Sequence, residues 1–99
     1  MSRSLVERRL SEVAARLKQL REELAVSDEQ LTHLAEAADD ARLRALVSET
    51  PLSDREHQDA QRHADAMARH RAEVLEGIAR LEASQDELLD RLLVETEPS

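Results

Sequence analysis

The sequence predicts an all-α fold, an antiparallel two-helix coiled-coil hairpin. Apolar residues recur with a seven-residue period in two long segments, and both segments are rich in Ala, Leu, Glu, Arg and Gln, which favour helices. A short segment that contains a proline separates them. The alternation of apolar and polar residues that is typical of strands is not seen. The 99-residue chain is therefore expected to form one helical hairpin.

The first apolar series predicts a helix over residues 4–48. Steps of three and four residues connect its positions, and Ser27 is the one polar residue among them. The series is Val6, Leu10, Val13, Leu17, Leu20, Leu24, Ser27, Leu31, Leu34, Ala38, Ala41 and Ala45. Ser4 and Glu7 have the spacing of a capping box at its start.

Residues 49–52 are predicted to form the turn. Pro51 disfavours the helical conformation for Thr50, and Ser53 with Glu56 has the spacing of a second capping box. An alternative interpretation has three helices, because residues 27–30 also resemble a capping box and the first helix could break near Ser27 or Asp39.

The second series predicts a helix over residues 53–95, followed by a short tail at 96–99. Arg71 and Gln85 are its polar positions. The series is Ala60, Ala64, Met67, Arg71, Val74, Ile78, Leu81, Gln85, Leu88 and Leu92. So short a connection makes neighbouring helices antiparallel. The two series match best when the numbers of facing residues sum to about 101 or 102, which places alanines against alanines next to the turn.

The composition excludes several kinds of function. The chain has no Cys, which rules out disulfides and zinc–thiolate sites, and its single Gly leaves no phosphate-binding loop. Its 22 acidic and 14 basic residues argue against direct binding of nucleic acid, which depends on Lys and Arg. A two-helix hairpin also lacks the cavity that an enzyme needs. We therefore expect no enzymatic activity and no cofactor.

No segment approaches the 18 consecutive apolar residues of a membrane-spanning helix. The first ten residues also lack the apolar stretch of a secretory signal. We expect a cytoplasmic protein that does not contact a membrane.

Large apolar residues near the turn predict a surface for a protein partner. Leu43, Leu46 and Val47 have helical spacing, but on the face opposite the alanines of the first series. With Leu52 they form a patch that the hairpin cannot bury by itself, unless the first helix folds back or a second copy covers it. The arginines expected around this patch are Arg42, Arg44 and Arg55.

A second group of apolar residues flanks the series of the second helix. Leu75, Leu89 and Leu93 would be buried if two hairpins formed a four-helix bundle. The sequence is compatible with such a self-associated homodimer and equally with an extended monomer.

Two sets of polar residues have side chains of the types that bind metal ions. The acids near the turn, Asp54 among them, could offer oxygen ligands to Mg²⁺, but helix capping and solvation are the favoured explanation, so no metal site is expected. The full set is Asp39, Asp40, Glu49, Asp54, Glu56 and Asp59. The histidines, His33, His57, His63 and His70, do not have metal-ligand spacing and are expected at the surface.

Residues 51–62, Pro-Leu-Ser-Asp-Arg-Glu-His-Gln-Asp-Ala-Gln-Arg, resemble the opening of the second helix in the N-terminal coiled coil of the bacterial Gre transcript-cleavage factors. Leu52, Ser53, Ala60 and Arg62 match that family, Asp54 is a conservative replacement, and residues 76–82 are similar to a later motif. The resemblance implies a hairpin that enters the secondary channel of RNA polymerase. It also implies that Asp54 helps to bind Mg²⁺ at the active centre of the polymerase. Pro51 stands where the family has its first acid.

We therefore expect a non-enzymatic coiled-coil module that docks through its turn onto a cytoplasmic protein machine, with RNA polymerase as the named candidate. The alternative is a self-associating structural coiled coil in which the turn has no role.

Overall fold

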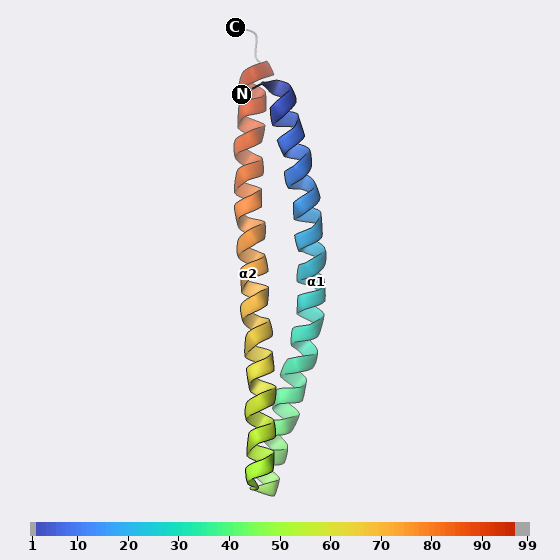
Figure 1. Ribbon diagram of the computed structural model, residues 1–99, viewed down its shortest axis with the longest axis vertical. Coiled ribbons are helices and arrows are strands. Elements are labelled where there is room, and N and C mark those ends of the chain that lie inside the picture. Colours follow the sequence, from blue (N-terminus) through green and yellow to red (C-terminus); the bar gives the residue numbers. More distant parts are fainter. Residues whose placement is uncertain (1, 97–99) are drawn as a thin grey trace. The chain divides into compact units, whose positions relative to one another are not determined.

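The computed structural model describes residues 2–96, and these form two long helices, α1 (Arg3–Ser48) and α2 (Pro51–Thr96) (Figure 1). The described residues contain no strand, so the predicted all-α helical hairpin is confirmed. Two compact units each contain a stretch of both helices. The open-end unit comprises Met1–Glu23 and Val74–Ser99, and the turn-end unit comprises Leu24–Glu73. The part of the predicted tail beyond Thr96 lies outside the described residues.

Helix α1 is capped by Ser2. The Oγ of Ser2 accepts a hydrogen bond from the amide of Leu5 at 3.2 Å, and its carbonyl accepts one from the amide of Val6 at 3.0 Å. The predicted capping box of Ser4 and Glu7 is therefore wrong. The carboxylate of Glu7 accepts a hydrogen bond from Arg3 at 2.9 Å instead, since the two side chains lie one helical turn apart.

Helix α1 runs without interruption through Ser27 and Asp39, so the three-helix interpretation is wrong. Ser27 is 2% exposed and occupies the position in the series that the heptad assigns to it. A serine fits at this place because its side chain is small. Among the described residues, none of the buried side-chain nitrogen or oxygen atoms lacks a hydrogen-bond partner.

The turn consists of Glu49 and Thr50. Glu49 has a φ of 51°, in the left-handed region, and its amide donates to the carbonyl of Ala45 at 3.0 Å. This is a common way for a helix to end, although glycine is the usual residue there.

Thr50 caps α2. Its Oγ1 accepts a hydrogen bond from the amide of Ser53 at 3.1 Å, and the Oγ of Ser53 accepts one from the amide of Thr50 at 3.3 Å. The turn is therefore two residues shorter than the predicted 49–52, and the predicted cap at Ser53 is wrong. Pro51 is the first residue of α2, where its missing N–H costs nothing and its fixed φ suits a helix.

Large apolar side chains form the seam between the helices in the open-end unit. Val6, Leu17 and Leu20 of α1 are buried, as are three residues of α2, Val74, Ile78 and Leu88. Gly77 allows close packing here, because a Cβ atom at this position would lie 3.1 Å from Cδ1 of Leu20.

Small side chains form the seam near the turn. Ala38, Ala41, Ala45 and Ala64 are buried in the turn-end unit, together with Ser27 and Ser53. Helix α1 contacts α2 farther along this unit through an ion pair between Asp28 and Arg71, a residue of the second apolar series. Every position of the two predicted series is buried or half-buried, which confirms the seam.

The seam extends one heptad closer to the turn than predicted. Ser53 is buried and His57 is half-buried, at the positions that precede Ala60 in the same pattern. His57 was expected at the surface, and this expectation is wrong. Both residues are polar, so the apolar pattern of the sequence does not indicate that the seam reaches this far.

Candidate protein-binding surface at the turn

The turn-end unit exposes four large apolar side chains close to the turn, Leu43, Leu46, Val47 and Leu52, which we call the turn patch. Their exposed fractions range from 49% for Leu43 to 86% for Val47. The chain therefore places its large apolar residues outside and its alanines inside over these last turns of α1.

Helical geometry explains the position of the turn patch. Residues three and four apart share one face of a helix, so Leu43, Leu46 and Val47 lie together on α1. Ala41 and Ala45 occupy the opposite, buried face. Because α1 remains helical to Ser48, it does not fold back over these side chains, and that alternative is wrong. Leu52 is the second residue of α2 and is 64% exposed.

The three predicted rim arginines differ in their surroundings. Arg42 donates from Nη2 to Oδ1 of Asp39 at 2.9 Å and from Nε to the same oxygen at 3.2 Å, so its head is held on α1. Arg44 and Arg55 are exposed. Ion pairs of this exposed type contribute little to stability, typically about 0.2–1 kcal/mol, so Arg42 can exchange Asp39 for another carboxylate.

The acids near the turn are not gathered into one cluster. Among the described side chains, no three His, Asp or Glu are grouped so that they could hold a metal ion. Asp54 is exposed in the first turn of α2, while Asp39 and Asp59 accept hydrogen bonds from Arg42 and Arg62. A metal ion at Asp54 would take its other ligands from water or from a second molecule.

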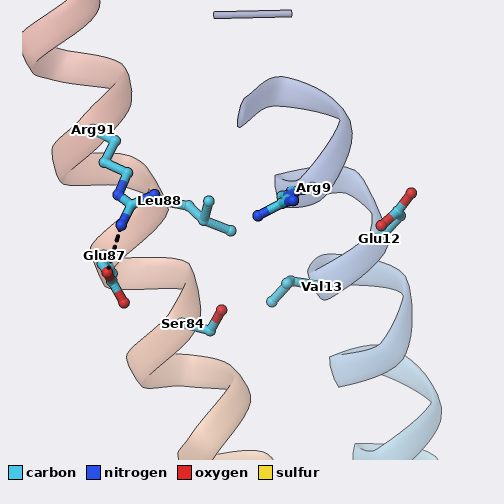
Figure 2. Close-up of a pocket in the computed structure, with 7 residues that line it drawn as sticks. All are labelled: Arg9, Glu12, Val13, Ser84, Glu87, Leu88 and Arg91. Carbon is cyan, nitrogen blue, oxygen red and sulfur yellow. Dashed lines mark hydrogen bonds and ion pairs between the residues drawn. The ribbon is translucent and has the colours of Figure 1, made fainter. Parts of the chain in front are cut away.

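A groove of about 330 Å³ lies between the helices of the open-end unit. Figure 2 shows Arg9 and Val13 of α1 pointing toward α2, and Leu88 and Ser84 of α2 pointing toward α1. Glu12, Glu87 and Arg91 complete the lining, and Arg91 donates to Glu87 at 3.0 Å. The sequence did not predict this groove, because most of its residues flank the seam and differ in chemical type.

A hollow of about 440 Å³ lies in the turn-end unit, against α2. His57, Gln58, Gln61, Arg62 and Asp65 line it, and Gln61 donates to Asp65 at 2.9 Å. These residues lie within nine positions of one helix, so the hollow is a depression in the surface of that helix.

Further large apolar residues are exposed outside the turn patch. Leu75, Leu89, Leu93 and Val94 of α2 range from 39% to 71% exposed, and they lie in the open-end unit. Val26 is 53% exposed on α1 and was not singled out from the sequence. A single exposed valine is common on protein surfaces and needs no special explanation.

Comparison of the chain with protein-family models, with curated proteins and with solved structures gives no match. The similarity of residues 51–62 to the Gre factors therefore stays a prediction. Within the described residues, neither helix contains a stretch that is long and apolar enough to cross a membrane.

Proposed function

We propose that this protein is a binding module without enzymatic activity that docks onto a protein partner through its turn patch. One observation carries the proposal: next to the turn, the small residues are buried and the large apolar residues are exposed. Alanines fill the seam there, whereas the turn patch, Leu43, Leu46, Val47 and Leu52, faces outward. Full burial of a Val or Leu side chain stabilises by about 1.5–3 kcal/mol, so leaving four of them at one end forgoes a large favourable term. Grouped exposed apolar residues usually mark an interaction surface.

The geometry suits insertion of a helix face into an apolar groove. Leu43, Leu46 and Val47 have the i, i+3, i+4 spacing of anchors in such complexes. The two-residue turn is held by the hydrogen bonds of Glu49, Thr50 and Ser53, so little ordering is needed when a partner binds. Arg44 and Arg55 favour a partner whose groove is bordered by carboxylates.

RNA polymerase is the candidate partner that the resemblance of residues 51–62 supplies. In that interpretation Asp54 meets a metal ion in the active centre of the polymerase. The exposure of Asp54 at the start of α2 is compatible with this role.

The test is direct binding of the purified chain to purified bacterial RNA polymerase, measured by biolayer interferometry. The variant Leu43→Ser/Leu46→Ser/Val47→Ser is expected to bind at least ten-fold more weakly, because its anchors are lost. Val26→Ser is the matched control, since it removes an exposed apolar side chain of α1 far from the turn in sequence and should change affinity less than two-fold. Circular dichroism of all three proteins checks that the helices persist.

Absence of binding to the polymerase would remove that partner. Capture from a cell extract with the same three proteins then tests the remaining proposal. If the triple variant retains every captured protein, docking through the turn patch is wrong. The alternative, a self-associating structural coiled coil, would then be the better interpretation.

A further inference from the structure

One side of the open-end unit combines exposed leucines with acids. Leu75 and Leu89 directly follow the buried seam residues Val74 and Leu88, and Glu82 is halfway between them in the same heptad position. A second row beside them contains Ala79, Asp86 and Leu93. All six are exposed, and we call them the leucine flank: Leu75, Ala79, Glu82, Asp86, Leu89 and Leu93.

The corresponding side of α1 carries two basic residues, Lys18 and Arg21, and the acid Glu7 near its start. In an antiparallel pair of helices, residues that follow equivalent seam positions lie on the same side of the hairpin. Ala14 and Arg21 follow the seam residues Val13 and Leu20, and Lys18 lies between them; all three are exposed. The groove in Figure 2 lies on the other side, because Arg9, Ser84 and Arg91 precede seam residues.

The two helices of this unit carry opposite charge. Residues 3–21 contain six basic and two acidic side chains, whereas residues 74–95 contain six acidic and two basic ones. The ion pairs of Arg3 with Glu7 and of Arg91 with Glu87 each lie within one helix. Two copies could meet through this side in two ways. Contact between the two α1 helices would bring basic residues close to one another, whereas contact of each α1 with the α2 of the other copy would pair opposite charges.

The surface of the chain leaves room for such a contact. Its accessible surface is 7190 Å². A compact protein of 11.2 kDa would expose about 5,700 Å². A specific protein–protein interface of standard size buries about 800 Å² on each partner. The excess is therefore larger than one interface of this kind requires.

We propose that this side of the open-end unit binds a second copy of the chain, with α1 of each copy against the leucine flank of the other. Leu75, Leu89 and Leu93 lie in the centre of this homodimer. Lys18 and Arg21 lie against Glu82 and Asp86 of the partner. The surface belongs to a different unit from the turn patch, so the proposal does not depend on the proposed function. If both hold, each dimer carries two turn patches and binds a target with paired sites more tightly than one copy would.

Analytical ultracentrifugation of the full chain tests the dimer. The sedimenting species of the wild-type chain is expected to have twice the mass of one chain. For the variant Leu75→Ser/Leu89→Ser/Leu93→Ser, the dissociation constant of the dimer is expected to rise at least 100-fold. The matched control is Leu43→Ser/Leu46→Ser/Val47→Ser, which removes three exposed apolar side chains from the turn-end unit and should leave the mass unchanged. A monomeric wild-type chain at millimolar concentration, or a larger assembly, would overturn the proposal.

Exchange of charges keeps the proposal testable if the leucine variant does not fold. Lys18→Glu/Arg21→Glu and Glu82→Lys/Asp86→Lys should each weaken the dimer at least ten-fold, whereas a 1:1 mixture should restore it. Mixing cannot relieve like charges inside one hairpin, so recovery reports contact between copies. The proposal is wrong if each variant dimerises like the wild type, or if the mixture stays monomeric while circular dichroism shows that both variants are helical.

Discussion

The open-end unit and the turn-end unit follow the same heptad but fill it with residues of different size. Leucine, valine and isoleucine are buried in the open-end unit. In the turn-end unit the buried residues are Ala38, Ala41, Ala45, Ala64 and two serines. Leu24, Leu31, Leu34 and Met67 are only half-buried there.

The two units therefore contribute differently to the fold. The seam of the open-end unit provides most of the stabilising burial, and the seam of the turn-end unit allows the helices to approach each other. Burial of large apolar side chains is the dominant stabilising term, so the open-end unit gains more per heptad. Alanine contributes less burial but permits close approach of two helices. Near the turn the large apolar residues are instead exposed, where they are accessible to a partner.

The largest expected effect is the loss of a seam leucine in the open-end unit. Leu17 is 1% exposed, so Leu17→Ala removes buried carbon atoms and leaves a cavity, and it should lower the free energy of unfolding by about 2–5 kcal/mol. Urea unfolding followed by circular dichroism measures this change. Leu46→Ala is the matched control in the turn patch and should cost less than about 0.5 kcal/mol. Equal losses in the two variants would contradict the contrast between the units.

The turn-end unit should respond to the opposite change in size. Ala41 is 3% exposed between the helices, so Ala41→Leu must push them apart and should lower the free energy of unfolding by about 1–3 kcal/mol. Ala25→Leu makes the same substitution at an exposed position of the same unit and should remain within about 0.5 kcal/mol of the wild type. A neutral Ala41→Leu variant would show that the alanine seam is loosely packed.

The caps of the two helices extend the comparison. Thr50→Ala removes the hydroxyl that accepts from the amide of Ser53 in a half-buried network, and it should cost about 1–2 kcal/mol in urea unfolding. Ser2→Ala removes the equivalent bond at the exposed start of α1 and should cost about 0.5 kcal/mol. If the Ser2 variant loses as much, the turn is no better ordered than the free end of the hairpin.

The smallest expected effect is a gain. Gly77→Ala should raise the free energy of unfolding by about 0.5 kcal/mol, because alanine favours a helix by up to about 1 kcal/mol but its Cβ displaces the end of Leu20. In a Leu20→Ala background the gain should approach about 1 kcal/mol. A loss of stability in the Gly77→Ala variant would mean that the side chain of Leu20 cannot move. The helices of the open-end unit would then be packed too tightly around Gly77 to accept a Cβ atom.

The seam could be predicted from the sequence because its signal is a period that recurs through both helices. Its polar members, Ser27, Arg71 and Gln85, were identified by position alone, because a helix cannot move one residue out of register without moving the next. The exposure of Leu43, Leu46 and Val47 followed from the same counting. Ser53 and His57 were missed because no apolar residue marked that heptad.

The helix starts could not be predicted to the residue. Ser2, Ser4, Thr50 and Ser53 all have side chains suited to a cap, and the choice depends on backbone geometry rather than residue type. At the turn, Glu49 adopts a left-handed conformation that its residue type does not favour, so that Thr50 can cap a helix that begins at Pro51.

The sequence by itself determined the helical class, the antiparallel pairing, the residues of the seam and the apolar residues left outside it. These follow from helical periodicity and from a connection too short for any other pairing. Tertiary structure alone decided the residue at which each helix begins, which hydroxyl caps it, and that Asp28 pairs with Arg71 across the seam. These features depend on which of several similar side chains meets a partner in space, and only the packed helices distinguish them.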